Sequence, residues 1–225
     1  MIYHETEHGV LYCGDCLDIL PTLGVKADLV LTDPPYGIGI GATVGGNNLS
    51  IAKNYGDFNN WDNDIPSKEV FESMLKYSNN QIIFGGNYFI EYLKNSPCWI
   101  VWDKDNTGNF ADCELAWTSF KTAVRMYKYR WNGMLQENMK EKDKRYHPTQ
   151  KPVALLGWCL QNYSKEQDLI LDPFAGSGTT AIAAIRYNRR YILIEKEEKY
   201  CEIAAKRIEN ELDQYSIDLF AEENE

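Results

Sequence analysis

Four consecutive residues, Asp33-Pro34-Pro35-Tyr36, place a carboxylate, a rigid turn and an aromatic ring directly after a largely apolar run. The two prolines fix the backbone φ angle and remove two N–H donors, so the neighbouring carbonyls stay able to accept hydrogen bonds from a ligand. A carboxylate, a carbonyl and a ring together suit an enzyme that holds a flat, amino-bearing ring and acts on its nitrogen. We therefore treat this tetrapeptide as the candidate catalytic motif.

A second candidate site is a predicted strand, a tight glycine turn and a helix over residues 169–180 (Leu-Ile-Leu-Asp-Pro-Phe-Ala-Gly-Ser-Gly-Thr-Thr). Glycines let a ligand approach the backbone, and the helix N-terminus favours a negatively charged group. No lysine follows the glycines, so this is not a P-loop. The spacing Gly176-x-Gly178-x-x-Ala181 matches the relaxed dinucleotide fingerprint, and Glu195, at the end of the next strand, is placed to bind ribose hydroxyls. A nucleoside-bearing cofactor is expected, and both NAD and S-adenosylmethionine fit at this point.

The elements that must position these motifs follow from the hydrophobic pattern. Short apolar runs alternate with amphipathic stretches, which is typical of an α/β sheet with helices on both faces. A glycine-rich polar segment at residues 37–60 directly follows the tetrapeptide, and we interpret it as a flexible lid rather than a disordered linker. We predict strands at residues 9–14, 29–32, 81–85, 98–102, 114–119, 169–172 and 191–195, and helices at residues 15–20, 67–77, 88–94, 152–163, 178–187 and 197–215.

The chain has 225 residues and a formal net charge of −10, which by itself argues against a nucleic-acid partner. The charge is unevenly distributed, however. Residues 121–151 hold nine Lys or Arg against three acids, whereas residues 195–225 hold eleven acids against four bases. Phosphates respond to the local field within about 8–10 Å. The basic segment also carries Tyr127, Tyr129, Trp131 and Tyr146, which suits contact with phosphates and bases, although a solvated hairpin of alternating charges gives the same pattern.

Several classes of protein are excluded. No apolar run approaches the 18 residues of a membrane-spanning helix. The N-terminus lacks the basic and apolar regions of a signal peptide, so we expect an intracellular protein. The six cysteines are scattered and expected as free thiols in a reducing compartment. Cys13 and Cys16 have C-x-x-C spacing, but no second ligand pair exists for zinc, and no metal is expected.

The two motifs, Asp33–Tyr36 and residues 172–179, together resemble the catalytic and cofactor motifs of amino-group DNA methyltransferases, which act on adenine N6 or cytosine N4. The catalytic motif comes first here, and this circularly permuted order is similar to that of the beta subgroup. Residues 147–152 (His-Pro-Thr-Gln-Lys-Pro) and 14–18 (Gly-Asp-Cys-Leu-Asp) extend the resemblance over almost the entire chain. It implies an S-adenosylmethionine-dependent methyltransferase with a Rossmann-like fold, a mostly parallel seven-stranded sheet in a single catalytic domain of residues 1–225.

The resemblance also implies roles for individual residues. Asp33 and the Pro34 carbonyl would accept both amine hydrogens of a base flipped out of the duplex, and Tyr36 would stack on that base. For Asp15 the alternative is a helix N-cap, for Glu195 a surface acid and for Lys151 a surface lysine. The implied ligands of S-adenosylmethionine are Asp172, Gly176, Ser177, Gly178 and Thr179 around the methionine moiety, Glu195 at the ribose, Asp15 at the adenine with Phe174 packed nearby, and Thr149 with Lys151 at the methionine carboxylate.

The interval between the two motifs is where this subgroup carries its target-recognition segment, here residues 121–147. The implied partner is double-stranded DNA, and the implied location is the cytoplasm of a bacterium or of the host of a phage. A homodimer and a partner restriction endonuclease are left open. The candidate DNA-binding residues are Lys121, Arg125, Lys128, Arg130, Lys144 and Arg145.

Four alternatives stay open at this level. Cytosine N4 is the nearest one, although Asp rather than Ser at position 33 favours adenine within the family. An NAD-dependent oxidoreductase built on Gly176–Ala181 would leave the Asp33–Tyr36 motif without a role. A non-catalytic DNA-binding module is a third alternative. RNA or a protein glutamine as the substrate is the fourth, because related Pro-Pro-Tyr motifs serve both.

Overall fold

A computed structural model describes residues 1–39, 62, 64–106, 111–132, 135–140, 142–146 and 149–222, with side chains of the last helix described to residue 215. Most of the segment expected to form a lid, residues 40–60, therefore lies outside the described residues. None of the helices in the described ranges is long and apolar enough to cross a membrane.

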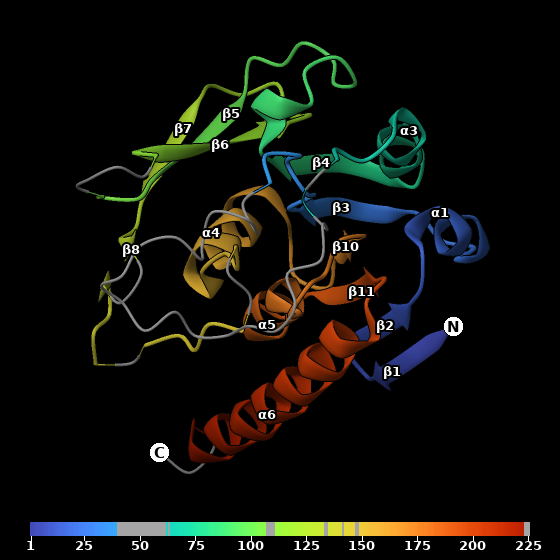
Figure 1. The fold of residues 1–225 in the computed structure, drawn as a ribbon. Helices are drawn as coiled ribbons and strands as arrows, with labels where there is room; N and C mark the ends of the chain where they lie inside the picture. The colour runs from blue at the N-terminus through green and yellow to red at the C-terminus, as the bar shows by residue number, and fades with distance from the viewer. Residues whose placement is uncertain are drawn as a thin grey trace.

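Nine strands of the described chain form one mixed sheet in the order β1-β2-β11-β10-β3-β4-β6-β5-β7 (Figure 1). The five strands β2, β11, β10, β3 and β4 run parallel, and β6 is antiparallel to both of its neighbours. The strands are β1 (Ile2–Thr6), β2 (Gly9–Cys13), β3 (Ala27–Thr32), β4 (Ser78–Phe84), β5 (Trp99–Asp103), β6 (Cys113–Thr118), β7 (Arg125–Lys128), β10 (Leu169–Asp172) and β11 (Arg190–Glu195).

All seven expected strands are present, and the sheet has two more than expected. The additional strands, β1 and β7, form its two edges, β1 antiparallel to β2 and β7 parallel to β5. Their residues are mostly exposed, so neither has the apolar run by which a buried strand is recognised. A separate two-stranded hairpin, β8 (Trp131–Asn132) and β9 (Leu135–Gln136), follows β7.

The helices cover the sheet from both sides. They are α1 (Cys16–Ile19), the 3₁₀ turn η1 (Leu20–Thr22), α3 (Lys68–Lys76), the 3₁₀ turn η2 (Gly86–Tyr88), α4 (Val153–Tyr163), α5 (Thr179–Arg186) and α6 (Glu198–Glu222). The long helix α6 lies beside β1 and β2 in Figure 1. The prediction of a helix at residues 88–94 is wrong. Gly85, in the left-handed conformation at φ 69°, starts only the single turn η2, and the chain continues in turns.

Alternating strand residues divide the core into two layers. Leu29 and Leu31 of β3 face a cluster that includes residues of α4, α5 and α6, whereas Val30 faces a second cluster that includes residues of α1 and α3. This period of two is what a strand buried on both faces requires. The same alternation continues in β4, β10 and β11, so both layers run under the centre of the sheet.

The two chemical motifs follow neighbouring strands. β3 and β10 are adjacent and parallel, with Leu29 opposite Ile170. Their carboxyl ends therefore lie at the same edge of the sheet, where open α/β sheets bind ligands. A buried hydrogen bond of 2.7 Å from the Thr32 hydroxyl to Asp172 Oδ1 joins the two ends.

Candidate active site

Asp33 follows β3 directly, and both of its carboxylate oxygens have partners. The Tyr36 hydroxyl donates a hydrogen bond of 2.5 Å to Oδ1. The Lys151 ammonium donates one of 2.5 Å to Oδ2 and another of 3.2 Å to the Tyr36 hydroxyl oxygen. Burial raises the pKa of Asp33, and the charge of Lys151 opposes this increase. The carboxylate thus lies in a compact cluster of three polar groups.

Glu114 of β6 extends this cluster. Its Oε2 lies 3.1 Å from Lys151 Nζ, and its Oε1 forms an ion pair with Lys104. Only 6% of the Lys151 side chain is exposed, so its charge requires these partners. Burial acts to raise the pKa of Glu114, but the two ammonium groups outweigh it and hold that pKa at about 2. From the sequence, Glu114 is recognised only as an acid at the edge of a strand. We call the four residues Asp33, Lys151, Glu114 and Lys104 the charge chain.

The placement of Lys151 corrects its expected role. The resemblance assigns it to the methionine carboxylate, but its ammonium is bound by Asp33 and Glu114. It is not a surface lysine either, because it is almost fully buried. Burial acts to lower the pKa of Lys151, whereas the two carboxylates outweigh this effect and raise it, so the ammonium stays charged. Thr149, two residues earlier, remains a predicted ligand.

The Tyr36 ring is held on several sides. Tyr88 of η2 stacks on it, with ring centroids 4.9 Å apart and planes at 16°, and Phe89 contacts it at 6.1 Å in an edge arrangement. A Cβ on Gly85 would overlap the Tyr36 ring, so this position needs glycine for space as well as for its positive φ. A base that stacks on Tyr36 must use the face that Tyr88 leaves open or displace Tyr88. The sequence gives no signal for Tyr88.

Asp62 fixes the backbone of the catalytic turn. The backbone N–H groups of Tyr36 and Gly37 both donate to its Oδ1, at 2.8 and 3.1 Å. Asp62 is 4% exposed. A buried carboxylate that accepts two amide hydrogens positions the turn rather than meeting a substrate. Sequence reasoning missed this residue because it lies beyond the long polar segment. Pro34, also buried, stays a predicted acceptor through its carbonyl.

The glycine turn after β10 has the backbone that its sequence predicts. Gly176 and Gly178 adopt positive φ angles of 51° and 78°. The Gly176 N–H donates to Glu195 Oε2 at 2.7 Å, and the Glu197 N–H donates to the other oxygen at 2.8 Å. Burial raises the pKa of Glu195. A Cβ on Gly176 would meet nothing within 4 Å, so the space in front of the turn is open to a ligand.

Asp172 points into the protein. Its oxygens accept hydrogen bonds from the hydroxyls of Thr32 and Thr180, at 2.7 and 2.5 Å, and from the Phe174 N–H at 3.0 Å. Burial raises the pKa of Asp172 to about 6. This carboxylate therefore joins β3, the turn and α5 instead of presenting itself to a ligand. Phe174 is partly buried beside the second core cluster, and its contact with a cofactor remains a prediction.

The side chains of Ser177 and Thr179 also face the protein. Arg207 of α6 donates to the Ser177 carbonyl at 2.6 Å, to its hydroxyl at 2.8 Å and to the Thr179 hydroxyl at 3.2 Å. The Ser177 hydroxyl donates to Gln150 at 3.2 Å. Any contact of these two residues with a cofactor must therefore come mainly from the backbone.

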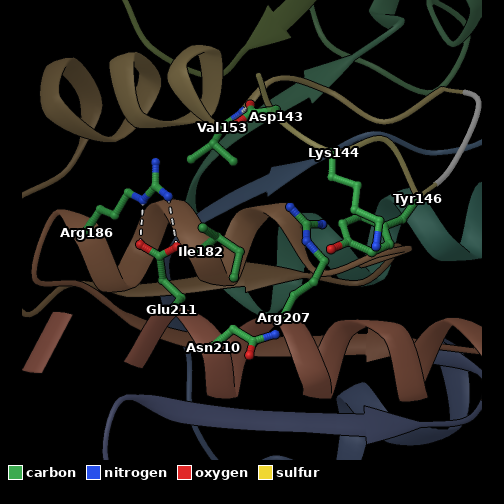
Figure 2. Close-up of a pocket in the computed structure, with 9 residues that line it drawn as sticks. All are labelled: Asp143, Lys144, Tyr146, Val153, Ile182, Arg186, Arg207, Asn210 and Glu211. Carbon is green, nitrogen blue, oxygen red and sulfur yellow. Dashed lines mark hydrogen bonds and ion pairs between the residues drawn. The ribbon is translucent and has the colours of Figure 1, made fainter. Parts of the chain in front are cut away.

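A pocket of about 180 Å³ lies on the α5–α6 side of this turn (Figure 2). Arg207 and Lys144 both lie over the Tyr146 ring there, at 4.9 and 4.8 Å from its centroid. Arg186 forms an ion pair with Glu211 across the same pocket, at 2.5 and 2.8 Å. Lys144, expected at DNA, thus packs on an aromatic ring next to the pocket.

Asp15 caps α1. Its Oδ1 accepts the Leu17 N–H at 3.0 Å, which is the N-cap alternative, and its Oδ2 lies 3.3 Å from Lys196 Nζ. The two roles are compatible, because a carboxylate has four lone pairs. Contact of Asp15 with the cofactor's adenine stays a prediction.

The basic segment combines exposed charged side chains with buried and partly buried aromatic rings. Lys121 and Arg125 are exposed, whereas Lys128 and Arg130 both pair with Asp105, which lowers the pKa of Asp105. Arg145 lies over the ring of Trp131. The DNA role of these five basic residues stays a prediction.

The aromatic residues of this segment pack inward. Tyr127 stacks on Tyr129 and on Trp158 of α4, with centroids 5.9 and 5.2 Å apart, and Trp131 is 6% exposed. The sequence leaves both contact with bases and a solvated hairpin open for this segment, and these three rings instead pack against the protein. They attach β7 and the following hairpin to α4, because an edge strand with one apolar face must bury that face.

Comparisons with known proteins agree with this geometry. A family model described as a DNA methylase matches residues 114–206. Type II methyltransferase M2.DpnII of Streptococcus pneumoniae is 30% identical to this chain, over 93% of the chain and 92% of that protein. The crystal structure of the M1.HpyAVI-SAM complex is 25% identical with a TM-score of 0.55, over 88% of this chain and 98% of that one. The fold is shared with the cytosine-N4-specific PvuII DNA methyltransferase, which is 18% identical with a TM-score of 0.59, over 94% and 92% of the two chains.

The fold, the two motifs and these relatives together define an S-adenosylmethionine-dependent methyltransferase. The chain belongs to the family of DNA methylases that modify exocyclic amino groups at adenine N6 or cytosine N4. It is thus an enzyme that transfers the methyl group of S-adenosylmethionine to DNA.

Proposed function

We propose that this enzyme methylates N6 of adenine at a specific DNA sequence, by direct transfer to a flipped base. One observation carries the proposal: Asp33 and Tyr36 form a hydrogen-bonded pair at the end of β3, beside the glycine turn that ends β10. The type II methyltransferases among its relatives support a specific site. Asp at position 33 favours adenine over cytosine N4.

Asp33 acts on the nitrogen rather than on the ring. The exocyclic amine is a poor nucleophile, because its lone pair is delocalised into the ring. By accepting an amine hydrogen, Asp33 draws the nitrogen toward tetrahedral geometry and frees the lone pair. The Pro34 carbonyl takes the second hydrogen, and Tyr36 holds the base by its ring. No covalent bond to the enzyme is needed.

The cofactor residues fit S-adenosylmethionine. The open space before Gly176 and the partly buried Glu195 carboxylate suit a nucleoside ligand with hydroxyl groups. The bound cofactor supplies an electrophilic methyl group, which passes in line to the amine nitrogen as the methyl–sulfur bond breaks and its electron pair stays on sulfur. Asp33 takes the proton that the nitrogen releases. Asp15, Phe174 and Thr149 complete the proposed cofactor contacts, and Asp172 supports the turn from behind.

DNA reaches the site through the segment 121–147 in this proposal. Flipping the base costs a few kcal/mol, which contacts of exposed Lys121 and Arg125 with phosphates help to offset. We also propose that residues 37–60 form a lid and that the enzyme is located in the cytoplasm. The proposal leaves open whether the enzyme forms a homodimer and whether a partner restriction endonuclease exists.

The decisive experiment identifies the product. Duplex DNA is incubated with the enzyme and S-adenosylmethionine labelled in its methyl group, and the nucleosides are then analysed by mass spectrometry. N6-methyl-2′-deoxyadenosine is the expected nucleoside, and mapping of the label on the intact duplex should place it in one sequence context. N4-methylcytosine would replace the adenine assignment, and no methylated base on any duplex or single-stranded DNA would overturn the proposal.

A further inference from the structure

The charge chain alternates in sign from the catalytic carboxylate outward. Asp33 is bound by Lys151, Lys151 by Glu114, and Glu114 by Lys104. Glu114 belongs to β6, and Lys151 lies in the segment before α4. Both are distant from Asp33 in the sequence, so it is the fold that brings them next to it. Glu114 lies 3.5 Å from the Tyr36 hydroxyl as well. The mechanism so far uses Asp33 and Tyr36 but gives no task to Glu114.

We propose that Glu114 is a positioning residue that acts through Lys151 and sets how readily Asp33 accepts a proton from the substrate's amino group. This inference rests on the proposed role of Asp33 as the acceptor. The proton leaves the amine nitrogen as that nitrogen bonds to the methyl carbon, and it ends on a carboxylate oxygen of Asp33.

Sharing of the ammonium is the physical basis. A lysine bound to Asp33 alone would stabilise the ionised carboxylate and make it a weak proton acceptor. Because Glu114 Oε2 lies 3.1 Å from the same Nζ, part of that positive charge is balanced elsewhere. Lys104, on the other Glu114 oxygen, keeps Glu114 ionised in turn. Asp33 thus stays charged in its partly buried site and still accepts a proton during transfer.

The other groups that face Asp33 do not replace this function. Tyr36 donates to it through a hydroxyl, and burial and the adjacent carboxylates raise the pKa of that phenol. Asp172 of β10 is near enough for Asp33 to raise its pKa, but it is bound by two hydroxyls and an amide. Tyr88 stacks on Tyr36 and brings no charge to the cluster. Among the described residues, Lys151 is therefore the cation at Asp33, and Glu114 is the acid that shares it.

The test uses opposite shifts of a pH profile. Glu114→Gln removes a negative charge that raises the pKa of Asp33, so the acid limb of the kcat profile should move to lower pH by about one unit, with a plateau about tenfold lower. Lys151→Met removes a positive charge that lowers the same pKa, so its limb should move to higher pH. Lys151→Arg, which keeps the charge, should leave the limb near its wild-type position.

A matched control and a second readout complete the design. Glu72→Gln changes an exposed glutamate on α3 that pairs with Lys68, and it should leave the profile unchanged. Carbon-13 NMR titration of the Asp33 carboxyl, assigned with Asp33→Asn, should show the same opposite shifts in the free enzyme. If the limb and the titration stay in place in Glu114→Gln, or move the same way in both variants, the inference is overturned. A wild-type enzyme without product would instead overturn the proposed function, while the titration still tests Glu114.

Discussion

The Lys151 ammonium lies 2.5 Å from Oδ2 of Asp33, although 118 residues separate the two in the chain. The pair joins the catalytic turn after β3 to the segment that leads into α4, and therefore links the first motif to the half of the chain that carries the cofactor turn. The structure also explains why a buried lysine is tolerated here, because two carboxylates surround it.

Asp33→Asn should abolish most of the activity. The amide keeps the shape of the side chain but loses the charge that accepts the amine proton, so kcat should fall by about 10² or more. Binding of S-adenosylmethionine, measured by calorimetry, should stay within a few-fold. Asp213→Asn, an exposed change on α6, is the control. Near-normal turnover of Asp33→Asn would contradict the assigned mechanism.

Gly85→Ala should damage the catalytic turn more than an ordinary glycine substitution does. At Gly24, which also has a positive φ, an added Cβ meets nothing, so Gly24→Ala should cost only about 1 kcal/mol in the free energy of unfolding. At Gly85 the new methyl group would also overlap Tyr36, which should add about 1–3 kcal/mol and lower kcat. Urea unfolding of both variants measures the difference, and equal losses would contradict this account.

Arg207→Met should weaken cofactor binding from the far side of the glycine turn. The guanidinium holds Ser177 and Thr179 by three hydrogen bonds, and their loss should raise the Kd for S-adenosylmethionine about tenfold. Lys206→Met, which breaks only an exposed ion pair with Glu202, should leave that Kd unchanged. An unaltered Kd in Arg207→Met would show that the turn keeps its shape without the hydrogen bonds of Arg207.

Because of Asp172, the free energy of unfolding should decrease as the pH rises from about 4 to about 6. Its pKa is raised to about 6 in the folded protein, against 3.8 as the ordinary value, so the folded state binds more protons than the unfolded state in this window. Relative to Asp172→Asn, the free energy of unfolding of the wild type should decrease by on the order of 1–3 kcal/mol as the pH rises through this window. It should not decrease further above pH 7. Urea unfolding at each pH tests this, and a constant difference would contradict the raised pKa.

Lys121→Ala and Arg125→Ala should weaken DNA binding at all sequences alike. Both side chains are exposed, and each lost phosphate contact should reduce the slope of log K against log salt by about 1. Lys26→Ala, just before β3 and so away from the carboxyl ends of the strands, is the control. Titrations of labelled duplex at several salt concentrations give the slopes. Unchanged slopes in both variants would move the DNA contact to another part of the chain.

Much of the fold could be predicted from local pattern. Apolar runs identify the seven inner strands, and the glycine turn at Gly176 and Gly178 has the left-handed backbone that its sequence requires. The edges could not be found in this way, because β1 and β7 are largely exposed and pair only at one side. The helix predicted at residues 88–94 does not form, although its apolar residues have helical spacing. Gly85 turns the chain just before this segment, and only the single 3₁₀ turn η2 follows.

The sequence by itself determined the two motifs, their order and the nucleoside type of cofactor, because each depends on neighbours within a few residues. Only the tertiary structure decided what surrounds Asp33. Lys151 and Glu114 lie far from Asp33 in the sequence, and folding brings the three charged groups into contact. Their attraction is strong there because the folded site is shielded from water. The tertiary structure likewise placed Tyr88 on Tyr36 and turned Tyr127 of the basic segment toward α4, since packing of a whole face decides which rings lie inward.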